Sequence, residues 1–198
     1  QSVTTSDLAE RFAEIRKLSE ALVKPLSEAD ATLQSMEDAS PAKWHIAHVT
    51  WFWETFLLRD HLDGYELFDN RFPFVFNSYY EAEGERIARF SRGMLSRPKL
   101  ADVLAWRHHV DEAMQPLLQR DDLRPLIQLG FAHEQQHQEL LLTDIKHALF
   151  QNPLGPAMWS ETASLGAASY DDDWYAHPGG IARIGHQSDC FAFENEGP

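Results

Sequence analysis

Residues 133–137, with the sequence HEQQH, carry the clearest chemical pattern in the chain. His133 and His137 are four residues apart, so on a helix both imidazoles project from one face and can reach the same metal ion. The segment fits the HExxH pattern, in which Glu134 would be the general base of a zinc peptidase. Which chemistry such a metal would perform depends on its third ligand.

A zinc-peptidase site needs that third ligand downstream of the motif. Leu140 and Thr143 occupy the positions at which a metzincin extension requires glycine and histidine. Glu161 is the early glutamate candidate, and it lies in a Gly- and Ala-rich stretch without a helical pattern. The downstream sequence therefore gives little support to a peptidase.

A better third ligand lies upstream, in residues 44–48 (WHIAH). His45 and His48 are three residues apart, so either can point into a helical bundle, where facing helices commonly build metal sites. His48 has Trp44, Trp51 and Phe52 at helical spacing, which places it on a buried stripe. The alternative is that these histidines only satisfy hydrogen bonds in a core. A site of three histidines would leave coordination positions open for substrates.

Composition limits the class of protein. The chain has 198 residues, 43% of them hydrophobic and 12% aromatic, which is enough for one domain and part of another. Its single cysteine, Cys190, excludes an internal disulfide framework and a cysteine-rich zinc site. A net charge of -14 would repel nucleic acid. Without a signal peptide or a membrane-spanning apolar run, we expect a cytoplasmic protein with no membrane partner.

Four stretches carry apolar residues at every third or fourth position together with helix start or stop signals. They run from Ser6 towards Pro25, from Pro41 to Gly64, from Pro98 to about Leu118, and from about Asp122 to Phe150. Ser40 is predicted to be the N-cap of the second helix, with Pro41 in its first turn. The pattern predicts a mainly α fold, a helical bundle that positions the histidines.

Two further regions differ from these helices. Residues 65–97 connect the second and third helices and are rich in aromatic residues and arginines, as functional loops often are. After Pro153 the composition shifts to Gly, Pro, Ser and Asp, and residues 179–185 (GGIARIG) predict a short strand bounded by glycines. We expect residues 154–198 to begin a second domain.

Four segments of the chain are shared, in the same order, with one known family. These are residues 40–48 (SPAKWHIAH), 76–80 (FNSYY), 92–98 (RGMLSRP) and 133–147 (HEQQHQELLLTDIKH). Together they resemble the ergothioneine-synthesising sulfoxide synthases, the EgtB family, over nearly the whole chain. Residues 179–198 resemble the opening of that family's second domain, which is related to formylglycine-generating enzymes.

The resemblance implies a DinB-like four-helix bundle over residues 1–153, followed at 154–198 by the start of an α+β formylglycine-generating-enzyme/sulfatase-modifying-like domain. It implies a mononuclear non-haem iron(II) bound by His48, His133 and His137. The family enzymes are oxidoreductases of ergothioneine biosynthesis that use O2 to join cysteine or gamma-glutamylcysteine to C2 of the hercynine imidazole, giving a sulfoxide. Three neutral imidazoles leave iron positions for the thiolate, the substrate imidazole and O2.

The resemblance also implies substrate contacts. The counterpart of Gln136 helps to hold the hercynine imidazole, although a surface amide is the plain alternative. Arg86 and Arg89 match the positions that clamp the carboxylates of the thiol, and guanidinium pairs with carboxylate in a bidentate fork. Relatives often have a His-Pro-Arg-Pro-like stretch where this chain has residues 87–91 (IARFS). That departure keeps open a selenosugar donor, and therefore selenoneine synthesis.

The family's catalytic tyrosine and several contacts to the trimethylammonium group come from the second domain, and none can be assigned here. We therefore expect these residues to be part of a longer polypeptide whose remaining second domain completes the site. Two other classes stay open. One is a zinc-dependent hydrolase or thiol transferase on the same bundle, and the other is a bundle with purely structural histidines.

Replacing His137 with alanine should remove the metal and abolish product formation in the full-length protein, because two ligands hold an ion far more weakly than three. Metal content per protein chain, measured after anaerobic loading with iron(II), checks this expectation. An unchanged metal content would refute the ligand assignment.

Overall fold

The computed structural model describes residues 5–159, 174, 176, 178–188 and 191–198. The chain divides into two compact units, Gln1–Met158 and Trp159–Pro198. The described part of the second unit contains one short 3-10 turn, Glu194–Glu196, and no strand. The strand predicted at 179–185 is therefore wrong, and the α+β domain predicted over 154–198 is not shown. Our boundary after residue 153 stays a prediction.

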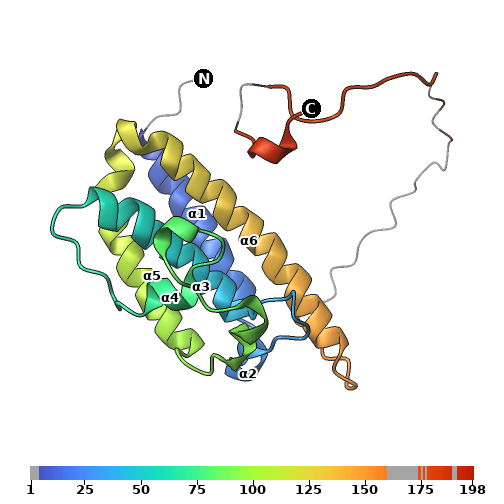
Figure 1. Cartoon of the computed structure of the whole chain (residues 1–198), viewed down its shortest axis with the longest axis horizontal. Coiled ribbons are helices and arrows are strands. Elements are labelled where there is room, and N and C mark those ends of the chain that lie inside the picture. Colours follow the sequence, from blue (N-terminus) through green and yellow to red (C-terminus); the bar gives the residue numbers. More distant parts are fainter. Residues whose placement is uncertain (1–4, 160–173, 175, 177, 189–190) are drawn as a thin grey trace. The chain divides into compact units, whose positions relative to one another are not determined.

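The first unit is helical, as the spacing of apolar residues predicted, and Figure 1 shows its arrangement. Its α-helices are α1 (Thr5–Val23), α2 (Glu28–Thr32), α3 (Ala42–Trp53), α4 (Phe72–Phe76), α5 (Leu100–Met114) and α6 (Arg124–Phe150). A π-helical turn, Glu54–Arg59, prolongs α3, and 3-10 turns lie at Glu81–Glu83, Arg89–Met94, Leu117–Gln119 and Asp121–Leu123. No helix in the described ranges is long and apolar enough to cross a membrane.

Helix α3 is the centre of the bundle. It packs against α1, α5 and α6, and all twelve of its residues are buried. A helix buried on every side must be mostly apolar, and three tryptophans, Trp44, Trp51 and Trp53, make it so. Its polar residues, which include His45 and His48, are consequently held inside the protein rather than in water.

The start of α3 differs from our expectation for Ser40. Pro41 is the N-cap residue, and no side chain caps the helix. The Ser40 amide instead donates to Oδ2 of Asp144 on α6 at 2.8 Å, and its hydroxyl accepts from Arg92 at 2.9 Å. Ser40 therefore fastens α3 to α6 and to the connection between α3 and α5, since these contacts cross from one element to another.

A close approach between α3 and α6 depends on Gly130. A Cβ added at Gly130 would lie 2.5 Å from Cη2 of Trp53, closer than any real carbon contact. The Trp53 ring also packs edge-on against Phe12 of α1, with ring centroids 5.1 Å apart, and against Phe131. Trp53 thus ties α3 to α1 and α6, and a glycine on α6 makes room for it.

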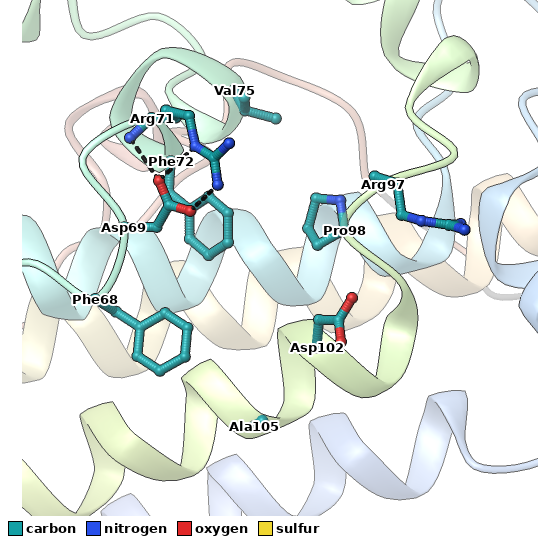
Figure 2. A pocket seen from close by; sticks show the side chains of 9 residues that line it. All are labelled: Phe68, Asp69, Arg71, Phe72, Val75, Arg97, Pro98, Asp102 and Ala105. Atoms are coloured by element: carbon teal, nitrogen blue, oxygen red, sulfur yellow. Dashed lines mark hydrogen bonds and ion pairs between the residues drawn. The ribbon is translucent and has the colours of Figure 1, made fainter.

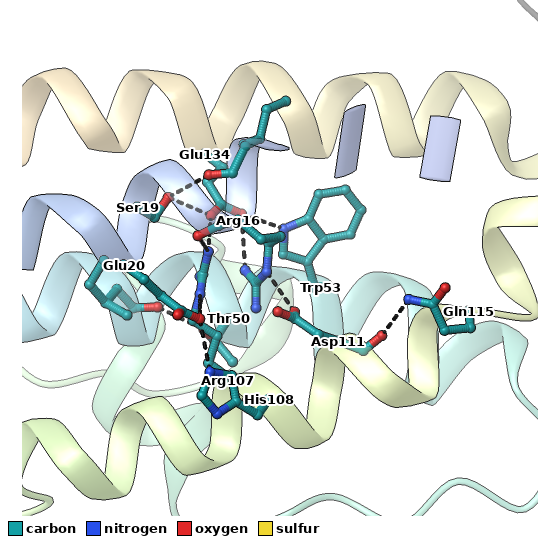
Figure 3. A network of polar contacts seen from close by, with 12 residues as sticks. Arg16, Ser19, Glu20, Thr50, Trp53, Arg107, His108, Asp111, Gln115 and Glu134 are labelled. Atoms are coloured by element: carbon teal, nitrogen blue, oxygen red, sulfur yellow. Dashed lines mark hydrogen bonds and ion pairs between the residues drawn. The ribbon is translucent and has the colours of Figure 1, made fainter. Parts of the chain in front are cut away.

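The same region contains a buried charged cluster around Glu134 (Figure 3). The fully buried Glu134 carboxylate accepts hydrogen bonds from Arg16 and Ser19 of α1, Trp53 of α3 and Arg107 of α5, at 2.5 to 2.9 Å. Arg16 also pairs with Asp111 at 2.6 Å. The two arginines hold the pKa of Glu134 far below its usual range, against the opposing effect of burial.

Replacing Glu134 with glutamine should lower the free energy of unfolding by about 3–5 kcal/mol, because Arg16 and Arg107 would keep their buried charges without a carboxylate. Urea denaturation of the metal-free protein measures this change. The matched control is Glu139→Gln, an exposed acid on the same helix, for which we expect a change within about 0.5 kcal/mol. Equal effects of the two substitutions would show that the cluster contributes little to stability.

Candidate metal centre

His48 of α3 and His133 and His137 of α6 converge in the first unit. Each offers one nitrogen ligand atom, and the three atoms lie within 4.8 Å of one another. The ring centroids are 4.6 Å apart for His48 and His137, 4.7 Å for His133 and His137, and 5.0 Å for His48 and His133. The structure therefore brings together the three residues that the sequence singled out, close enough for one metal ion.

The orientation of His48 is set by its neighbours. Its Nδ1 lies 2.6 Å from the carbonyl oxygen of Phe76, which can only accept, so Nδ1 carries the proton and Nε2 keeps a lone pair. Its ring is stacked between Trp44, at 4.8 Å, and Trp51, at 5.4 Å. The hydrogen bond and the two stacked rings together fix the plane of the imidazole before any ion binds.

His45 lies beside this cluster rather than within it. Its Nδ1 is 2.9 Å from Nδ1 of His137, and its Nε2 is 2.9 Å from Oδ2 of Asp144. The sequence left open whether His45 or His48 would point towards the α6 histidines as a ligand. The geometry favours His48, because both nitrogens of His45 already have hydrogen-bond partners.

The three clustered histidines form a suitable donor set for a transition metal. Burial lowers the pKa of His133 to about 4 and lowers the pKa values of His48 and His137 well below 6.5. All three are therefore neutral at pH 7, as metal ligands must be. Nδ1 of His133 is buried and lacks a hydrogen-bond partner among the described residues. Neutral imidazoles suit iron, zinc and copper.

A pocket of about 330 Å³ opens over the three histidines. Arg92 lies in its wall, buried, with its guanidinium carbon 3.4 Å from the centre of the Trp44 ring. Arg92 donates to the hydroxyls of Ser40 and Ser78, and no carboxylate lies within ion-pair distance of it in the described part of the chain. Burial, with repulsion from Arg89, lowers the pKa of Arg92 to about 10, which still leaves it charged at pH 7. Arg92 therefore has no direct carboxylate partner, although Asp38 and Asp144 also line the pocket.

Two of the three predicted substrate contacts line this pocket, and the third lines a neighbouring cavity. Gln136 is exposed on α6 and lines the pocket. Arg89 is half-buried, lines the pocket, and donates to the Asp38 carbonyl and the Tyr79 hydroxyl. Arg86 is exposed and lines a neighbouring cavity of about 540 Å³ that Arg89 and Arg92 share. The roles of all three in binding substrate stay predictions.

Sequence reasoning did not select Arg92 or Asp144 as parts of the site, and it considered His45 only as an alternative ligand to His48. Arg92 continues the three-residue spacing of Arg86 and Arg89, and this regularity could have pointed to it. His45 and Asp144 are 99 residues apart in the chain. No local pattern indicates that their side chains meet.

Glu134 does not act at this site as the peptidase pattern requires. Its carboxylate is fully buried among Arg16, Ser19, Trp53 and Arg107, and it does not line the pocket. A carboxylate held by two arginines is a poor general base, because its proton affinity is low. Glu161, the downstream ligand candidate, lies outside the described residues.

A second hollow, shown in Figure 2, lies between α4 and α5. Its volume is about 530 Å³, larger than that of the pocket over the histidines. It is lined by Phe68, Asp69, Arg71, Phe72, Val75, Arg97, Pro98, Asp102 and Ala105. Asp69 and Arg71 neutralise each other there in a 2.5 Å ion pair, and no histidine lines it. Size alone does not identify the chemical site.

When the chain is compared with known protein families, the match lies in the helical bundle. Residues 11–141 match the model of the DinB superfamily. The matched span begins within α1 and ends within α6, so it includes His48, His133 and His137. No curated protein matches the chain. The match therefore describes the domain that holds the three clustered histidines and does not select one activity.

The buried histidines should make the metal-free protein less stable as the pH falls from about 6.5 towards 4. Unfolded histidines titrate near 6.5, whereas His133 does so at about 4 when folded. In this interval the unfolded chain binds more protons, so the free energy of unfolding falls with pH. Urea denaturation at several pH values measures the slope. His133→Gln should flatten it, whereas the exposed His108→Gln should flatten it less. Identical slopes for wild type and His133→Gln would contradict this assignment.

Proposed function

The chain belongs to the DinB superfamily, and from that premise we propose that it is a non-haem iron(II) enzyme of ergothioneine biosynthesis. In this proposal it uses O2 to join the sulfur of cysteine or gamma-glutamylcysteine to C2 of the hercynine imidazole. The observation that carries the proposal is the convergence of three neutral histidines beside the buried Arg92, which has no ion-pair partner among the described residues. The motifs shared with the sulfoxide synthases supply the choice of iron and of substrates.

The overall reaction balances without an external reductant. The thiol loses its S–H hydrogen and the imidazole its C2–H hydrogen, and a carbon–sulfur bond forms between them. One oxygen atom of O2 becomes the sulfoxide oxygen, and the other leaves as water with the two hydrogens. Iron held by His48, His133 and His137 would supply the redox chemistry that O2 requires.

The side chains around the pocket would bind and orient the substrates. Arg92 and Arg89 offer positive charge to the carboxylate of an amino-acid thiol, and the low dielectric around Arg92 strengthens such a pair. Gln136 offers an amide that can donate to or accept from the imidazole of hercynine. Positioning both substrates at one ion lowers the entropic cost of their reaction.

A zinc enzyme is the second candidate, because three imidazoles with an open position also form a catalytic zinc site. A DinB-like hydrolase or thiol transferase would use the same three histidines and the same pocket. A selenosugar donor is a further variant of the main proposal, since residues 87–91 depart from the stretch that relatives often carry. The experiment must therefore identify which metal is bound and which donor molecule is used.

The test uses full-length protein loaded with iron(II) or with zinc under anaerobic conditions. Hercynine is offered with cysteine, gamma-glutamylcysteine or a selenosugar, O2 is admitted last, and products are identified by mass spectrometry. We expect a hercynine adduct only with iron and O2, and none from His137→Ala. His147→Ala, the matched control two to three turns further along α6, should retain activity. Stoichiometric zinc without any O2-dependent product would favour the second candidate.

A further inference from the structure

A chain of hydrogen bonds runs from the beginning of α3 to one of the metal-site histidines. The Ser40 amide donates to Oδ2 of Asp144, and the same oxygen lies 2.9 Å from Nε2 of His45. Nδ1 of His45 lies 2.9 Å from Nδ1 of His137. Asp144 is seven residues after His137, so both occupy the same face of α6 two turns apart. His45 on α3 spans the gap between them.

The direction of these bonds follows from the chemistry of their ends. The Asp144 carboxylate can only accept, so Nε2 of His45 must carry a proton. His45 is buried in the same pocket wall as Arg89 and Arg92, surroundings that favour the neutral imidazole, which has a single N–H, so its Nδ1 is an acceptor. The proton between the two histidines therefore belongs to Nδ1 of His137. Nε2 of His137 keeps its lone pair.

We propose that Asp144 and His45 are positioning residues that fix the tautomer and the ring orientation of His137 and so prepare its Nε2 to bind the metal. The inference rests on the proposed metal centre for its purpose. The tautomer that it assigns, however, is a property of the protein without metal. The two can therefore be tested separately.

The two proposed ligands His48 and His137 have different hydrogen-bond acceptors behind their imidazole rings. His48 donates to a neutral carbonyl, that of Phe76. His137 donates to an imidazole whose other nitrogen is bonded to a carboxylate. A carboxylate polarises the hydrogen-bonded chain behind it, which makes Nδ1 of His45 a stronger acceptor and Nε2 of His137 a stronger donor to metal. The Nε2 of His137 is therefore the more basic ligand nitrogen of the two.

The surroundings of the chain make it rigid. His45 is buried, and Asp144 is only 14% exposed at its side chain. Asp144 is held by a backbone amide as well as by His45, so its oxygen cannot rotate away without losing two hydrogen bonds. Similar outer partners of metal ligands in other proteins typically change metal affinity by about 10- to 100-fold when removed.

The direct test is nitrogen-15 NMR of histidine-labelled, metal-free protein at neutral pH, with the His137 signals identified from their loss in His137→Gln. We expect the proton of His137 on Nδ1. His45→Phe keeps the ring volume and removes both hydrogen bonds. Asp144→Leu leaves His45 in place and removes the carboxylate. Both should shift His137 towards the Nε2-protonated form, whereas Glu139→Leu, an exposed acid on the same helix, should not.

The second readout is binding of Co²⁺, followed by its visible absorption and by competition with a chelator. Both variants should weaken binding by about 10- to 100-fold and shift the absorption bands, with Glu139→Leu as control. A proton on Nε2 of His137 in the wild type, or a tautomer and a Co²⁺ spectrum that neither variant changes, would overturn the inference. The expected tautomer without any metal binding would leave the hydrogen-bond chain intact and refute the proposed metal function. If His45→Phe does not fold, the His137 tautomer and the Co²⁺ binding of Asp144→Leu decide whether the inference holds.

Discussion

The buried carboxylate of Glu134 holds the four long helices of the bundle in one arrangement. It accepts hydrogen bonds from α1, α3 and α5 while it belongs to α6. Because Glu134 points towards α1 and α5, the residue before it and the residue three positions later are turned towards α3. Those residues are His133 and His137. The rotation of α6, and with it the placement of the clustered histidines, therefore depends on an ion-pair cluster that lies outside the pocket. Removing one member of such a cluster is strongly destabilising, because the remaining buried charges lose their partner.

The charges around the pocket are distributed unevenly. The histidines are neutral, and the wall holds Arg89 and Arg92 as well as Asp38 and Asp144, of which Asp144 is engaged with Ser40 and His45. The protein as a whole has a net charge of -14. The two pocket arginines offer an anionic ligand local attraction in a protein whose overall charge repels it. Arg92 stacks on Trp44 and donates to two hydroxyl groups, and it has no direct carboxylate partner among the described residues.

The four long helices and the three clustered histidines could be predicted from the sequence because both depend on local spacing. Apolar periodicity located the helices, the four-residue spacing of His133 and His137 put both on one helix face, and His48 lay on an apolar stripe. The partners of Glu134 could not be predicted, since they come from three helices and the HExxH pattern suggests a different role for this residue. The meeting of His45 with Asp144 also depends on helix packing that spacing does not specify. The strand expected at 179–185 was wrong because alternating residues bounded by glycines also occur in irregular backbone.

The connection between α3 and α5 supplies both a hydrogen-bond acceptor and two arginines to the candidate metal centre. Phe76, on the short helix α4, gives the carbonyl that orients His48, and Arg89 and Arg92 follow on the same connection. In the proposed enzyme, a substitution that reshaped this connection to admit a new donor molecule would also move the acceptor behind a proposed metal ligand. Donor preference and metal affinity would then be linked properties. The same holds for His45 and Asp144, since both line the pocket over the histidines.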